Sequence, residues 1–273
     1  MEQTWRLKRR AIWLKVGDEN IKFFKQYVRG RRSTNTIWEL ENVDGTWATS
    51  FEKMANLGTS HFKNLFKDPH GAMLVETIKV VGYFPRFVDR DSAEELFNPV
   101  TMGELEEVLK WLKKDKSPGP YGWSVEFYLA FFDLLGQELL EVVEEAKSTG
   151  HLYDAFNSTF IALIPKSDHP SSFKDFRPIS LCNCIYKIMA KIIASRLKPI
   201  LSEHISPEQF AFLENRQIHE PIGVAQEGLH SMHTKKIKGM ILKIDLAKSF
   251  DQTSWLYIRM LLTHLGFPVS VIN

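Results

Sequence analysis

Apolar residues recur at intervals of three and four along much of the chain, which is the periodicity of amphipathic helices. The clearest example is "CIYKIMAKIIASRLKPIL", whose apolar residues fall on one helical face. "TMGELEEVLKWLKK" predicts another helix, because Thr101 and Glu104 have the spacing of an N-terminal capping box. "SPGP" ends that helix, since proline cannot continue one. The same periodicity predicts further helices in these ranges: 2–31 (two helices, broken at "VGDEN"), 51–67, 123–135, 136–149, 217–234 and 253–266.

Three other stretches have the pattern of β-strands. Two short runs flank Asp44-Gly45, a dipeptide favoured in hairpin turns. "TFIALIP" predicts a buried strand, and "GMILKID" predicts a second buried strand that ends at Asp245. Residues 70–100 have weak periodicity and contain Pro85 and Pro99, which predicts a linker or an irregular layer. Helices and strands without strict alternation predict the α+β class.

Composition changes this picture mainly through the distribution of charge. The chain has 273 residues, of which 44% are hydrophobic and 25% charged, as expected of a folded protein. Its net charge is +2, but residues 1–32 carry ten Lys and Arg against three acids, a net charge of +7. Such an arm favours a polyanionic partner, and the alternative is a solvated helix face. The candidate nucleic-acid-binding residues are Arg6, Lys8, Arg9, Arg10, Lys15, Arg29, Arg31 and Arg32.

Cysteine usage and hydropathy indicate an intracellular protein, in the nucleus or the cytoplasm. Cys182 and Cys184 form only a C-x-C in an apolar context, which is typical of buried thiols in a reducing compartment. No histidine accompanies them at a zinc-site spacing. No stretch is long and apolar enough to span a membrane, and the N-terminus lacks a signal-peptide pattern.

The candidate functional residues lie at or near the ends of the predicted strands. Asp245 at a strand end suits a ligand for Mg²⁺, which takes oxygen ligands, although a lone aspartate at such a position more often has a structural or capping role. Asp251 is a possible second ligand, or the cap of the following helix through the amides of residues 253 and 254. Lys166 and Arg177 flank a polar turn, where a lysine and an arginine suit a triphosphate. The alternative is solvated hairpin charge.

Several motifs in order carry a resemblance: "KSPGPYGWSVEFY", "FIALIPK", "FRPISLCNCIYKIMAKIIASRL", "SPEQFAFLENRQI" and "GMILKIDLAKSFDQTSW". Together they resemble LINE-type non-LTR retrotransposon reverse transcriptases, notably those of plants. "IWLKVGDENIKFFKQYVRGRR" resembles the stretch that such polyproteins carry between endonuclease and polymerase. The resemblance implies a basic helical extension with a small hairpin in residues 1–100, and reverse transcriptase fingers with a partial palm in residues 101–273.

The resemblance also implies roles for individual residues. The first metal-binding aspartate falls on Asp245, with the backbone carbonyl of Leu246 as a second Mg²⁺ ligand. The aromatic residue that excludes a 2′-hydroxyl falls on Phe250, and the triphosphate contacts fall on Lys166 and Arg177. Two further positions match a motif near template and nucleotide: Gln209 and Arg216. The implied partners are an RNA template, a DNA primer and dNTPs, with no membrane.

The sequence departs from the family pattern in ways that bear on activity. Tyr121 stands where the family has an acid, and Ser249 where it has an alanine. The family's adjacent aspartate pair is absent from the sequence, and one aspartate cannot hold the two ions of this chemistry. We therefore expect a fragment cut before the Asp-Asp motif and the thumb, which copies RNA into DNA when intact. The alternatives are a catalytically inactive nucleic-acid-binding remnant and an unstable product without a role.

Overall fold

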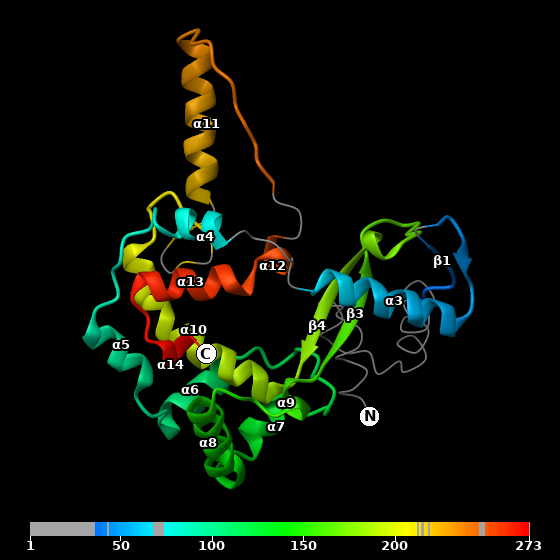
Figure 1. Cartoon of the computed structure of the whole chain (residues 1–273), viewed down its shortest axis with the longest axis vertical. Helices are drawn as coiled ribbons and strands as arrows, with labels where there is room; N and C mark the ends of the chain where they lie inside the picture. The colour runs from blue at the N-terminus through cyan, green and yellow to red at the C-terminus, as the bar shows by residue number, and fades with distance from the viewer. Residues whose placement is uncertain are drawn as a thin grey trace, which may run out of the picture. The chain divides into compact units, whose positions relative to one another are not determined.

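The computed structural model describes residues 36–42, 44–67, 74–211, 213, 216–217, 219–245 and 249–272. These residues form a mostly helical structure with two small sheets (Figure 1). The strands are β1 (Leu40–Glu41), β2 (Trp47–Ala48), β3 (Thr159–Pro165) and β4 (Phe176–Cys182). The helices are α3 (Phe51–Leu65), α4 (Leu74–Val81), α5 (Arg90–Phe97), α6 (Met102–Trp111), α7 (Val125–Ala130), α8 (Phe132–Thr149), α9 (Asp154–Asn157), α10 (Cys184–His204), α11 (His219–Thr234), α12 (Ser249–Gln252), α13 (Trp255–Leu265) and α14 (Val269–Ile272).

The chain divides into two compact units, and each is built from segments distant in the sequence. The first unit contains the described residues up to 65, then 113–127 and 157–184. The second contains the described residues of 66–112, 128–156 and 185–273.

The first unit contains both sheets, and each sheet is an antiparallel hairpin. The predicted turn at Asp44-Gly45 is confirmed, and Gly45 has φ 81°, a value that favours glycine. In the larger hairpin, β3 and β4 pair over seven residues, from Thr159 opposite Cys182 to Pro165 opposite Phe176. The aromatic ring of Phe173, at the turn of this hairpin, stacks on His61 of α3 at 5.4 Å between centroids.

The predicted strand "TFIALIP" exists, but the prediction that it is buried is wrong. Phe160, Ile164 and Ile179 of the β3–β4 hairpin are 59%, 44% and 44% exposed, whereas Phe176 on the other face is buried. A two-stranded hairpin has two faces, and the one buried residue of these two strands, Phe176, lies at the turn end of one of them. An apolar run therefore shows that a strand forms, but not that both of its faces are packed.

The second unit has a helical core. Val88, Ala93, Leu265 and Phe267 form a buried cluster with partly buried residues of α10 and α14 around it. α13 ends at Gly266, as predicted, with φ 105°. The predicted apolar face of α10 is confirmed in part, because Ile185, Ile188 and Ile192 are buried while Ile193 is exposed.

Three predictions of secondary structure are wrong. Residues 70–100 include helices α4 and α5, whose eight residues each are too short to show a clear periodicity. α8 begins at Phe132, so the predicted boundary between helices at 135 lies too late. "GMILKID" forms no strand, because a strand needs a partner and the two sheets in the described residues pair only within their own hairpins.

Among the described residues, no helix has the length and apolar character needed to cross a membrane.

Candidate nucleotide site

Lys166 and Arg177 lie on one face of the β3–β4 hairpin, near its turn. Arg177 pairs with Ile164, and the backbone N–H of Lys166 donates to the carbonyl of Asp175 at 2.8 Å. Directly opposed residues share a face of an antiparallel pair, and residues two apart on a strand share a face too. Lys166 and Arg177 are therefore diagonal neighbours, and both side chains are exposed.

The turn beside them is fixed by the carboxylate of Asp175. It accepts the backbone N–H groups of Ser172 at 2.9 Å and Ser171 at 3.0 Å. The bond from Ser172, followed by the one from Ser171, holds the pKa of Asp175 below its ordinary value, so the carboxylate stays ionised near neutral pH. The Nζ of Lys166 donates to the carbonyl of Lys174 at 2.6 Å, which keeps the ammonium group close to the turn.

Asp245 and Phe250 lie in the second unit, at exposed positions. Asp245 ends the irregular segment that replaces the predicted strand, and Phe250 of α12 is 95% exposed. Asp251 lies within α12 and does not cap α13, so that alternative is wrong. The cap of α13 is Ser254, whose hydroxyl accepts the N–H of Tyr257 at 3.5 Å.

No group of three His, Cys, Asp or Glu side chains within the described residues could hold a metal ion. Asp245 supplies one carboxylate, which fits a single Mg²⁺ shared with substrate phosphates, but does not fit a two-ion centre. Leu246 lies outside the described residues, as does the basic arm of residues 1–32 with all of its predicted nucleic-acid contacts.

Arg216 holds a loop together. Its guanidinium donates to the carbonyls of Ser206 at 2.5 Å, Gln209 at 2.6 Å and Ile205 at 2.9 Å. These three carbonyls belong to the loop that follows α10, which ends at His204. The resemblance assigns Arg216 and Gln209 to one motif near template and nucleotide. A hydrogen bond from the guanidinium of Arg216 to the backbone carbonyl of Gln209 joins these two residues.

Sequence reasoning missed Asn183. This side chain is only 3% exposed. Its Nδ2 donates to the carbonyl of Ser158 at 3.1 Å, and its Oδ1 accepts the N–H of Tyr121 at 3.1 Å. Asn183 thus connects the "SPGPYG" loop to the base of the β3–β4 hairpin. The available signal was a polar residue at the centre of the otherwise apolar "SLCNCI".

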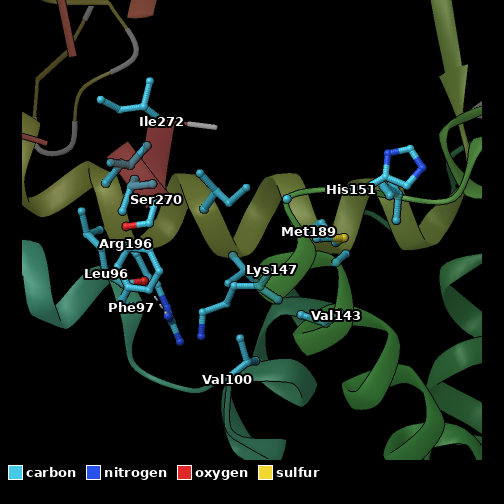
Figure 2. Close-up of a pocket in the computed structure, with 17 residues that line it drawn as sticks. Leu96, Phe97, Val100, Val143, Lys147, His151, Met189, Arg196, Ser270 and Ile272 are labelled. Carbon is cyan, nitrogen blue, oxygen red and sulfur yellow. Dashed lines mark hydrogen bonds between the residues drawn. The ribbon is translucent and has the colours of Figure 1, made fainter. Parts of the chain in front are cut away.

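An apolar cavity of about 320 Å³ lies in the second unit (Figure 2). Side chains of α5, α8, α10 and α14 surround it, with Lys147 and Arg196 at its polar side. Both cations are engaged, Lys147 with Glu144 at 3.3 Å and Arg196 with Glu104 at 2.7 Å. The described lining includes none of the residues predicted from the sequence to bind nucleotide or metal.

The C-terminal part of the chain matches a known protein family. Residues 164–273 match the family model described as Reverse transcriptase (RNA-dependent DNA polymerase). The matched segment contains Lys166, Arg177, Asp245 and Phe250, and the C-terminal part of the chain is therefore a reverse transcriptase family domain. Such enzymes generally use divalent metal ions and act on nucleic acids.

A relative extends the similarity beyond that segment. Over 242 residues, or 88% of this chain, the sequence is 30% identical to the "Transposon TX1 uncharacterized 149 kDa protein" of Xenopus laevis. The chain spans 18% of the length of that curated relative. These two matches confirm the resemblance as far as a reverse transcriptase family domain and a transposon protein.

Proposed function

We propose that this chain is part of a LINE-type non-LTR retrotransposon reverse transcriptase, an enzyme that copies RNA into DNA. The observation that carries the proposal is the family match over residues 164–273, which spans both the hairpin with Lys166 and Arg177 and the segment with Asp245. In this proposal residues 1–100 are a basic extension and residues 101–273 contribute the fingers and part of the palm.

The hairpin would bind the triphosphate of an incoming dNTP. Lys166 supplies a compact charge, and Arg177 supplies a planar fork that can hold two phosphate oxygens. Two cations on one exposed face suit this role, because a flexible triphosphate can contact both at once. Phe250 would exclude ribonucleotides, since its ring would occupy the volume that a 2′-hydroxyl needs.

Asp245, with the backbone carbonyl of Leu246, would hold Mg²⁺ together with the nucleotide. A bound Mg²⁺ would neutralise charge on the phosphates. Two-ion phosphoryl transfer needs further carboxylates, and this sequence contains no adjacent aspartate pair. In this proposal Asp245 is one of the carboxylates of such a centre and does not complete it alone.

The absence of an adjacent aspartate pair from this sequence favours a second candidate function, a catalytically inactive nucleic-acid-binding remnant of a retroelement. In that case the net charge of +7 in residues 1–32 supplies affinity that does not depend on sequence. The two candidates differ in whether the hairpin binds nucleotide.

The proposal is tested in a fusion protein that receives the missing aspartate pair and the thumb from a related reverse transcriptase. Arg177→Ala should raise KM for dNTP by about tenfold or more, because a charge-assisted hydrogen bond to phosphate is lost. Lys174→Ala is the matched control on the same hairpin, and it should leave KM unchanged. An unchanged KM in Arg177→Ala would contradict the proposed triphosphate site.

A further inference from the structure

Residues 113–123 of the first unit, "KKDKSPGPYGW", form a loop that combines exposed lysines with exposed aromatic rings. Lys113, Lys114 and Lys116 are all exposed. Tyr121 and Trp123 are each 48% exposed. We call this segment the KKDK–YGW loop. Neither the resemblance nor the family match, which begins at residue 164, assigns it a role.

The backbone of the KKDK–YGW loop is held firmly. Gly119 lies so close to the end of β4 that an added Cβ would come within 2.5 Å of the carbonyl carbon of Cys182. The N–H of Gly122 donates to the carbonyl of Gly119 at 3.0 Å, and Gly122 has φ 76°. The buried Asn183 accepts the N–H of Tyr121. The two rings are therefore carried on a preorganised support.

The rings are placed for stacking. Trp123 packs on Phe127, with centroids 4.2 Å apart and an angle of 37° between the rings. This contact orients the indole and still leaves about half of it exposed. A ring whose orientation is already fixed loses little conformational entropy when a planar ligand stacks on it. Bases of a single strand are such ligands, because every base has a flat face that can stack on an aromatic side chain.

The charge of the loop favours nucleic acid over a protein partner. Residues 113–123 contain three lysines and one acid, Asp115, so their net charge is +2. Within the described part of the chain, none of the three lysines forms an ion pair. Lysine is depleted in protein interfaces, whereas positive charge combined with exposed aromatic side chains is typical of single-strand binding surfaces.

We propose that the KKDK–YGW loop binds single-stranded nucleic acid, with bases stacked on Tyr121 and Trp123 and phosphates on Lys113, Lys114 and Lys116. The choice of RNA as the strand to be tested rests on the proposed function. Binding is measured without polymerisation, so that failure of the loop and failure of the polymerase assignment are distinguishable.

The test is the affinity of the full chain for a fluorescein-labelled oligouridylate, measured by anisotropy at several salt concentrations. The double variant Tyr121→Ala/Trp123→Ala should bind at least about fivefold more weakly. The triple variant Lys113→Gln/Lys114→Gln/Lys116→Gln should lower the slope of log K against log salt by about 2, since each phosphate contact on a single strand contributes about 0.7. Trp38→Ala, an exposed tryptophan beside Glu39 in the same unit, is the control and should bind normally.

A conservative variant separates stacking from loss of structure. Tyr121→Phe/Trp123→Phe keeps both rings and should retain most of the affinity, with an unchanged circular dichroism spectrum. The proposal is overturned if the double alanine variant binds like the wild type. It is also overturned if the phenylalanine variant loses as much affinity as the alanine variant while remaining folded, or if the wild-type chain does not bind the oligouridylate.

Discussion

A single guanidinium, that of Arg196, connects three segments of the second unit. It binds both carboxylate oxygens of Glu104, with Nε at 2.9 Å and Nη2 at 2.7 Å. It also donates to the carbonyls of Leu96, Asn98 and Pro99 at 3.0, 2.6 and 3.3 Å. The hydrogen bonds that Arg196 donates to Glu104 raise the pKa of Arg196 above its ordinary value, so it stays charged over the whole working pH range. This network joins α10 to the start of α6.

Replacing this side chain should destabilise the protein. In Arg196→Met, Glu104 and three carbonyls lose their donor, and we expect the free energy of unfolding to fall by about 2–4 kcal/mol. Urea denaturation measures the change. Lys110→Met is the control, because its ion pair with Glu106 is exposed (58% and 42%) and should contribute about 0.5 kcal/mol or less. Equal losses in both variants would contradict the role given to Arg196.

The residues of this network show what a local pattern can and cannot reveal. The spacing of Thr101 and Glu104 predicted a capping box, and the Thr101 hydroxyl does accept the N–H of Glu104 at 3.1 Å. The carboxylate of Glu104 is instead bound by Arg196, 92 positions away. A cap depends on neighbours three residues apart and is visible in sequence. The choice of a distant partner depends on how the helices pack, and it is therefore not visible in a local sequence pattern.

At the scale of elements, the β3–β4 hairpin depends on its turn, and the turn depends on Asp175. Its depressed pKa means that ionised Asp175 stabilises the folded state. That stabilisation is fully present above the unfolded-state pKa and is lost as the pH falls through the lower folded-state pKa. The hairpin that positions Lys166 and Arg177 is therefore expected to loosen in acid.

The variant Asp175→Asn tests this linkage. It should lower the thermal midpoint at neutral pH, because a neutral amide accepts the two N–H bonds more weakly than a carboxylate. The difference from wild type should shrink as the pH falls from about 5 to about 2. Asp168→Asn, on the same turn and without a hydrogen bond in the described residues, is the control. A difference that stays constant with pH would show that the charge of Asp175 is irrelevant.

Elements with their own internal hydrogen bonds were the most predictable. Helix α10, helix α13 with its terminal Gly266 and both hairpins follow from periodicity and turn residues. The structure of "GMILKID" was not predicted correctly, because a strand requires a partner strand and an apolar run does not specify one. Its apolar side chains are exposed in the structure, with Met240 at 89% and Leu242 at 75%. Asp245 was first noted as an aspartate at the end of this predicted strand, which does not form, and the resemblance to a family motif is what assigns it the role of metal ligand.

At the scale of the whole molecule, the asymmetric charge leads to a prediction about nucleic-acid binding. We expect a chain that lacks residues 1–32 to bind single-stranded RNA more weakly than the full chain, and with a smaller dependence on salt. The removed segment carries the net charge of +7 and aromatic side chains that can stack on bases. Fluorescence anisotropy over a salt series measures both quantities.

The control for this deletion is Lys235→Gln/Lys236→Gln, which removes two exposed charges that follow α11. It should change affinity little. Equal affinities of the full and shortened chains would show that the arm is only a solvated helix face, which was the alternative left open by its charge.

The central claim is that this chain contributes the first catalytic aspartate of a reverse transcriptase, and primer extension on an RNA template tests it most directly. The fusion protein that supplies the aspartate pair and thumb is compared with its Asp245→Asn and Asp251→Asn variants. We predict Mg²⁺-dependent extension by the parent fusion and by Asp251→Asn, since the resemblance places the metal-binding aspartate on Asp245 and assigns no role to Asp251 on α12. Asp245→Asn, which removes a metal ligand, should abolish extension. Extension that persists in Asp245→Asn would contradict the account.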